Sequence, residues 1–142
     1  MDNTIRIKCG SANMHFGEIT EMLRNAYWSI GIHRSEVERG VANSALVVGA
    51  FTAADRQIGY ARVISDKTRF AYITDVIVHE DYRKQGIGQA LIKSILESEA
   101  LQDVYQWLLI TKDAHEVYRR AGFSVTARPN DWMEIWHPRP AR

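Results

Sequence analysis

The stretch VIVHEDYRKQGIGQALI, which runs from Val76 to Ile92, decides the expected fold because its character changes twice. It begins with β-branched residues, which are typical of a buried strand, and then passes through a short, mostly charged segment. It continues through Gly86 and Gly88 into apolar residues at helical spacing. The stretch therefore predicts a strand, a basic loop with two glycines and the start of a helix, in that order.

The composition of the whole chain indicates one ordinary globular domain over residues 1–142, with 46% hydrophobic and 25% charged residues. The 18 Lys and Arg nearly balance the 17 Asp and Glu, so we expect neither nucleic acid nor a membrane as a partner. The single cysteine, Cys9, excludes an internal disulfide and fits a reducing compartment. The first ten residues lack the apolar segment of a signal peptide, so we expect a cytoplasmic protein.

Apolar periodicity predicts an α/β (α+β) fold in which strands and helices are mixed. A helix between the long central strand and the strand that follows it implies a right-handed parallel crossover in an otherwise mostly antiparallel sheet. The expected elements are a strand at Ile5–Ile7, a helix at His15–Asn25, a helix from about Ser35, strands at Ala45–Phe51, Ile58–Ser65 and Phe70–His79, a helix to about Glu99, a buried strand at Tyr105–Thr111, a helix opened by a capping box of Asp113 and Glu116 and ended by Gly122, and a terminal hairpin of Phe123–Thr126 and Met133–His137.

The glycine loop has the properties of an anion-binding site. A helix N-terminus carries unpaired N–H groups and a partial positive charge, and glycines let a bulky anion approach the backbone closely. Arg83 and Lys84 add positive charge at the loop entrance. The alternative is a glycine loop that only turns the chain into the helix. A P-loop string is absent, and a dinucleotide fingerprint would need a third small residue where the chain has Leu91.

Two motifs in the chain resemble those of the Gcn5-related N-acetyltransferase (GNAT) superfamily. Arg83, Gly86 and Gly88 are similar to its acetyl-CoA-binding pattern, Arg/Gln-x-x-Gly-x-Gly/Ala. The segment LLITKDAHEVYRRAGF resembles its second motif, a strand followed by a helix that bears a tyrosine and ends in Gly-Phe. The order of expected elements also resembles that of the family over nearly the whole chain.

The resemblance implies acetyl-CoA as the cofactor. Backbone groups of the long strand would pair with the pantetheine arm as if it were an added strand, and the loop amides would hold the pyrophosphate. The implied cofactor-binding residues are Ile77, Val78, Arg83, Lys84, Gln85, Gly86, Ile87 and Gly88.

Tyr118 is the expected general acid, because it stands where the family places that residue. Helical spacing puts it on one stripe with Ala114, Val117 and Ala121, so its ring should face the sheet. A phenol with an ordinary pKa of about 10 keeps its proton at neutral pH and can donate it to a leaving thiolate. The alternative is a half-buried tyrosine that only packs.

Asp75 is the most unusual charge, since strict alternation puts it mid-strand on one face with Ile73 and Ile77. A buried carboxylate there would be a candidate general base, directly or through water, and the alternative is a structural carboxylate bonded to a loop amide. His115, near the start of the last helix, is another candidate base or cofactor contact, with a structural role beside the cap as the alternative.

An acceptor pocket is expected from aromatic side chains, although each of them is also an ordinary core residue. No His, Cys or Asp cluster has ligand spacing, so no metal is expected. The pocket candidates are Trp28, Tyr72 and Trp132.

The sequence therefore predicts an N-acetyltransferase that passes acetyl directly to a primary amine of a small molecule or a protein. A non-catalytic acyl-CoA-binding regulatory module is the alternative, and the missing third glycine disfavours a nucleotide-binding oxidoreductase. No residue pattern names the acceptor. A homodimer is among the expected assemblies, because related folds often dimerise.

Overall fold

The computed structural model describes residues 3–139 and 141–142 of the chain. Short 3-10 turns occur at Ser11–Asn13, Glu80–Tyr82, Glu99–Leu101 and Pro129–Asp131. The helices and strands are, in chain order, β1 (Arg6–Cys9), α1 (Phe16–Arg24), α2 (Arg34–Ala42), β2 (Leu46–Phe51), β3 (Gln57–Ser65), β4 (Phe70–Val78), α3 (Ile87–Leu96), β5 (Gln106–Leu108) and α4 (His115–Arg120).

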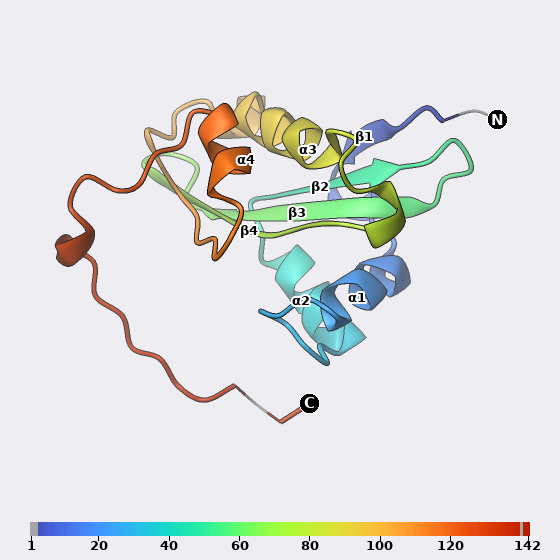
Figure 1. Cartoon of the computed structure of the whole chain (residues 1–142), viewed down its shortest axis with the longest axis horizontal. Coiled ribbons are helices and arrows are strands. Elements are labelled where there is room, and N and C mark those ends of the chain that lie inside the picture. The colour runs from blue at the N-terminus through green and yellow to red at the C-terminus, as the bar shows by residue number, and fades with distance from the viewer. Residues whose placement is uncertain (1–2, 140) are drawn as a thin grey trace.

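The five strands form one sheet in the order β1-β2-β3-β4-β5. Neighbouring strands are antiparallel except β4 and β5, which are parallel and joined through α3. Helices α3 and α4 cover one face of the sheet, and α1 and α2 cover the other (Figure 1). The expected mixed sheet with a single parallel crossover is therefore confirmed.

A hydrophobic core lies on each face of the sheet. Helix α3 buries Ile87, Leu91, Ile92 and Ile95 against the upper face in Figure 1. On the other face, α1 and α2 bury a second apolar cluster with Phe51 of β2. Full burial of one such side chain stabilises a fold by about 1.5–3 kcal/mol, so the two cores hold the helices firmly on the sheet.

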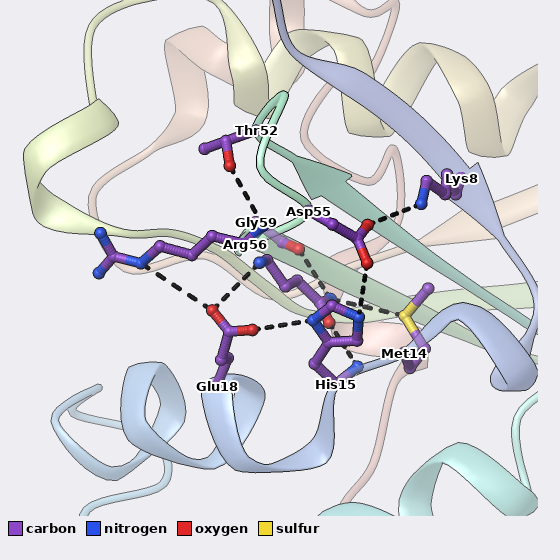
Figure 2. A network of polar contacts seen from close by, with 9 residues as sticks. Lys8, Met14, His15, Glu18, Thr52, Asp55, Arg56 and Gly59 are labelled. Carbon is purple, nitrogen blue, oxygen red and sulfur yellow. Dashed lines mark hydrogen bonds and ion pairs between the residues drawn. The ribbon is translucent and has the colours of Figure 1, made fainter.

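A polar network fastens the start of α1 to the β2–β3 turn (Figure 2). Gln57 lies at its centre. The Gln57 side-chain Oε1 accepts from the backbone amide of His15 at 2.8 Å, and the backbone amide of Gln57 donates to Glu18 Oε2 at 3.1 Å. Lys8 Nζ donates to Asp55 Oδ1 at 2.8 Å at the edge of the network. Because a buried amide left unpaired is costly, these bonds fix the position of the start of α1.

A β-bulge in β4 changes the face on which Asp75 lies. Tyr60 pairs with Ile77 but Arg62 pairs with Thr74, so β4 holds one residue more than β3 between these pairs. Asp75 has φ of 57°, in the left-handed region.

The expected strict alternation is wrong, because the bulge breaks the period of two. Ile73 packs in the core beneath α3, whereas Ile77 packs in the core beneath α1 and α2. Asp75 therefore shares no single face with both of them.

Two expectations for the segment between α3 and α4 are also wrong, those for its strand and for the capping box. The strand expected at Tyr105–Thr111 shortens to β5, which is only partly buried, because it pairs with β4 over three residues and then leaves it. The capping box of Asp113 and Glu116 does not form. Ala114 is the N-cap of α4, and its amide donates to Thr111 Oγ1 at 3.0 Å.

The terminal hairpin is absent from the described residues. Residues 123–139 contain no strand, and residues 124–139 are exposed. A strand needs a hydrogen-bonded neighbour, and this segment has none within the described part of its own chain.

Candidate functional site

The site begins where β4 and β5 separate. The two strands pair from Phe70 to Tyr72 and from Gln106 to Leu108, and then diverge. From Ile73 to Val78, β4 has no strand on its β5 side in the part of the chain that the structure describes. An open edge of this kind can hydrogen-bond an extended ligand that carries amide groups, as an added strand would.

The glycine loop lies at the end of this open edge and turns the chain into α3. Gly86 is the N-cap with φ of 79°, and Lys84 also has a positive φ, of 63°. The amides from Lys84 to Gln89 have no hydrogen-bond acceptor among residues 3–139 and 141–142. Several free N–H groups at the first turn of a ten-residue helix make a site for an anion.

Gly88 has no structural reason to be glycine. It lies in the first turn of α3 with no positive φ, and a Cβ built on it would meet no protein atom within 4 Å. Gly86 differs, because its left-handed backbone itself favours glycine. The open space over Gly88 fits a ligand that approaches the backbone closely, as the pyrophosphate of acetyl-CoA would.

The other expected cofactor residues lie around the loop. Arg83 Nε donates to the Val78 carbonyl at 3.0 Å, which fixes the loop to the end of β4. Lys84 and Gln85 are exposed, whereas the Ile87 side chain is buried in the core, so Ile87 can offer only its backbone. The donor set, free amides with two cations, suits a pyrophosphate.

A cavity of about 1210 Å³ extends from the open edge of β4 beneath the loop that follows α1. It brings together residues that are far apart in sequence: Trp28, Tyr72, Asp75, Ile77, Val78, Arg83 and Tyr118. Trp132 is not among them and lines a separate cavity of about 650 Å³ beside β5. His115 is exposed on α4 and does not line the large cavity either.

Asp75 lies in the cavity wall with both carboxylate oxygens engaged. The Trp28 indole Nε1 donates to Oδ1 at 3.0 Å, and Arg62 Nε donates to Oδ2 at 2.7 Å. The Asp75 side chain is 12% exposed and that of Arg62 is 21% exposed, so this ion pair is partly shielded from water. Its partners are side chains of the cavity wall, and not the loop amide that the sequence suggested as the structural alternative.

Tyr118 reaches the cavity from α4. Gln89 Nε2 of α3 donates to the Val117 carbonyl at 2.7 Å and holds α4 in place. The Tyr118 ring packs edge-to-face on Phe123, with 6.1 Å between ring centroids. Burial, with a smaller effect of Tyr27, raises the pKa of Tyr118 above its usual value of about 10, so the phenol stays protonated well beyond neutral pH.

Sequence reasoning missed several charged residues of the cavity wall, among them Arg62, Glu36 and Arg142. Arg142 Nη2 donates to Glu36 Oε2 at 2.6 Å, and this bond lowers the pKa of the Glu36 carboxyl. A signal for Arg62 existed, because an arginine in the middle of the apolar strand β3 needs a buried anion such as Asp75. No local signal connects Arg142 with Glu36, which lies 106 residues earlier.

No group of three or more His, Cys, Asp or Glu side chains in residues 3–139 and 141–142 has the arrangement of a metal site. Within the same residues, no helix has the length and apolarity to span a membrane.

Comparison with known sequences gives one consistent family. The family model described as an acetyltransferase (GNAT) domain matches residues 42–125, which include β4, the glycine loop, α3 and α4. The soybean (Glycine max) protein named histone acetyltransferase TAP1 is 27% identical over 132 residues, which are 92% of this chain but 53% of that protein. The chain thus spans about half the length of this relative.

Solved structures agree with the sequence comparison. A GNAT-family protein from Xanthomonas campestris pv. campestris is 32% identical, with a TM-score of 0.88 over 97% of this chain and 96% of that one. The GNAT-family acetyltransferase SP0256 of Streptococcus pneumoniae, at 24% identity and a TM-score of 0.74, shares the fold over 96% of this chain and all of that one. The family match over more than half of the chain, together with the 32% identical structure, shows that this protein belongs to the GNAT family of acetyltransferases.

Proposed function

We propose that the protein is an acetyl-CoA-dependent N-acetyltransferase that transfers acetyl directly to a primary amine. The observation that carries the proposal is one cavity whose wall holds Tyr118 and Asp75 and also includes Ile77 and Val78 of the open β4 edge and Arg83 at the entrance of the glycine loop. A thioester, a proton donor and an amine can meet there without any covalent enzyme intermediate.

Residues of β4 and the loop would hold the cofactor. The free amides from Lys84 to Gly88, with the Arg83 and Lys84 side chains, would bind the pyrophosphate, and the edge at Ile77 and Val78 would pair with the pantetheine amides. When bound, acetyl-CoA supplies a thioester that an amine can attack. The side chains of Trp28 and Tyr72 would form aromatic walls of the cavity in which the thioester and the amine meet.

Tyr118 acts in this proposal as the general acid that donates its hydroxyl proton to the leaving sulfur. Its raised pKa keeps that proton available at neutral and mildly alkaline pH. Asp75 acts as the acceptor of the proton that the amine must lose, through a water molecule, because both carboxylate oxygens already accept bonds from Trp28 and Arg62.

Acetyl-CoA binding gives the first test. A ligand that binds only the folded state at one hundred times its Kd stabilises the fold by about 2.7 kcal/mol, which raises the melting temperature by several degrees. We expect this rise with acetyl-CoA, and none with NADH or ATP at the same concentration. A rise with NADH or ATP alone would make the assigned cofactor class wrong.

The Asp75→Asn variant tests the base. We expect a loss in kcat of at least tenfold near neutral pH, because the neutral amide cannot take up a proton. The loss should shrink as the pH approaches the amine's own pKa, about 10 for a lysine-like acceptor, since the neutral amine then forms without help. The measurement is a pH profile of kcat for both proteins.

The Arg62→Gln variant is the matched control, because it breaks the same ion pair but leaves the carboxylate. If both variants lose the same activity at every pH and both lower the melting temperature, Asp75 holds the cavity wall and is not the base. The structural role alone predicts this pattern, because a partly buried partner is left unpaired in either variant.

The acceptor amine stays open between small molecules and proteins. The name of the soybean relative supports including histone-like lysine peptides in a panel of amines, beside polyamines and amino acids.

A cytoplasmic location is part of the proposal, since Cys9 is a lone, exposed cysteine, as is usual in a reducing compartment. The competing function, a regulatory module that binds acyl-CoA without catalysis, would bind the cofactor but release no thiol with any amine.

A further inference from the structure

The wall of the large cavity holds a second ion pair besides that of Asp75 with Arg62. Arg142 Nε donates to Glu36 Oε1 at 2.9 Å and Arg142 Nη2 donates to Oε2 at 2.6 Å, so the guanidinium covers both carboxylate oxygens. The Arg142 side chain is 15% exposed and that of Glu36 is 34% exposed. The Glu36 carboxylate is thus an anion of the cavity wall that is covered by a cation of the same chain.

Glu36 lies along the same wall as the catalytic carboxylate proposed above. It precedes Gly40 by one turn of α2, a rise of about 5.4 Å, and both residues line the cavity. A Cβ built on Gly40 would lie 3.5 Å from Arg62 Cζ, and Arg62 in turn bonds Asp75. The Arg62 side chain and one turn of α2 therefore separate Glu36 from Asp75.

The segment that carries Arg142 is held to this wall mainly by arginine side chains. Residues 135–139 also line the cavity. The chain reaches it by passing from α4 round to the side of the sheet that carries α1 and α2 (Figure 1). In the described part of the chain, residues 133–139 and 141–142 make no backbone-to-backbone hydrogen bond, whereas Arg139 Nη1 donates to the Tyr27 carbonyl at 3.0 Å. Because solvent-accessible ion pairs contribute little to stability, Arg142 can leave Glu36 at a small cost.

We propose that Glu36 binds a second cationic group of the acceptor amine, and that Arg142 covers this position until the acceptor displaces it. The inference rests on the proposed function. The bidentate guanidinium shows which chemistry the Glu36 carboxylate accepts. Because Arg62 and a helical turn separate Glu36 from Asp75, several bonds must join the two nitrogen groups of the acceptor. The acceptor class is therefore an amine with a distant guanidinium or ammonium group, in a small molecule or in a basic peptide.

Agmatine and butylamine measure the contribution of the second cation, because they share a four-carbon chain and only agmatine carries a guanidinium. The measurement is the ratio of kcat/KM for agmatine to that for butylamine. In Arg142→Gln this ratio should rise about fivefold, since the Glu36 carboxylate is no longer covered. In Glu36→Gln the ratio should fall below the wild-type value, and Arg142→Gln added to that variant should not raise it again.

Two variants are matched controls for this ratio. Arg128→Gln removes an arginine from an exposed ion pair with Asp131, which lies outside the large cavity. Asp113→Asn removes another carboxylate of the cavity wall, an exposed one. Neither should change the ratio. The proposal would be overturned by an unchanged ratio in Arg142→Gln, by equal gains for both amines in that variant, or by a preference for agmatine that depends on Asp113 and not on Glu36.

Isothermal titration of agmatine into the protein with coenzyme A separates this inference from the proposed function. If no amine is acetylated but agmatine binds Arg142→Gln about fivefold more tightly than the wild type, the proposed function fails and the cation site stands. If amines are acetylated but agmatine binds Glu36→Gln as tightly as Arg142→Gln, the cation site fails and the proposed function stands. A short peptide with a lysine beside an arginine, assayed in the same variants, distinguishes a peptide from a small molecule as the source of the second cation.

Discussion

The Tyr118→Phe variant should lose about 100-fold in kcat while its affinity for acetyl-CoA changes little. The substitution keeps the ring against Phe123 and removes only the hydroxyl of this cavity-lining residue. General acid catalysis contributes roughly 10²–10⁴-fold, and the lower end is expected because a thiolate leaves tolerably well without a proton. A 100-fold loss corresponds to about 2.7 kcal/mol of barrier.

Steady-state kinetics and a melting curve on the same preparation measure this effect. Tyr105→Phe is the control, because its hydroxyl bonds Arg69 on the surface at 3.1 Å and does not line the cavity. A merely structural Tyr118 would give the opposite result, with a lowered melting temperature and a loss in kcat below about threefold. The leaving sulfur would then take its proton from water.

The Gly88→Val variant should bind acetyl-CoA about 100-fold more weakly, which is roughly 2.7 kcal/mol of binding free energy. The valine methyl groups would fill the space over the free amides and keep the phosphates from the backbone. The fold should persist, since a Cβ at this position meets no protein atom within 4 Å. Isothermal titration with coenzyme A gives the affinity directly.

Gly17→Val is a matched control for this measurement. Gly17 is also the second residue of a helix, α1, and a Cβ there would meet only the tip of Arg34 at an ordinary distance of 3.9 Å. We expect the control to keep wild-type affinity. If Gly88→Val binds coenzyme A as tightly as Gly17→Val does, the glycine has no part in binding the pyrophosphate.

The glycine loop and the parallel crossover could be predicted because their causes are local. Apolar spacing specifies α3, and the pattern from Arg83 to Gly88 is contiguous in the sequence. The face of Asp75 could not be predicted in this way. It depends on a bulge in the pairing of β4 with β3, and a single shift in register reverses the side on which each following residue lies.

The C-terminal segment, residues 123–139, shows a different limit of prediction from sequence. The alternation around Met133 and Ile135 predicts a strand, but the structure has no strand there, because the pattern does not specify a neighbour with which it could pair. Trp132 was expected in the acceptor pocket as an aromatic side chain, and it lines the cavity beside β5 instead, because aromatic composition does not say which surface a side chain lines. The bond between Arg142 and Glu36 could not be predicted from the sequence either, because contacts between residues this far apart in sequence depend on the tertiary fold.

The most direct test of the proposed function is transfer of the acetyl group itself. The purified chain would be incubated with acetyl-CoA and each member of the amine panel, and free thiol and acetylated amine would be measured together by mass spectrometry. We expect at least one amine to give N-acetyl product and free coenzyme A in a one-to-one ratio, at a rate that falls about 100-fold in Tyr118→Phe. Tight binding of acetyl-CoA without amine-dependent product across the panel, or product formed equally fast by the variant, would contradict the proposed function.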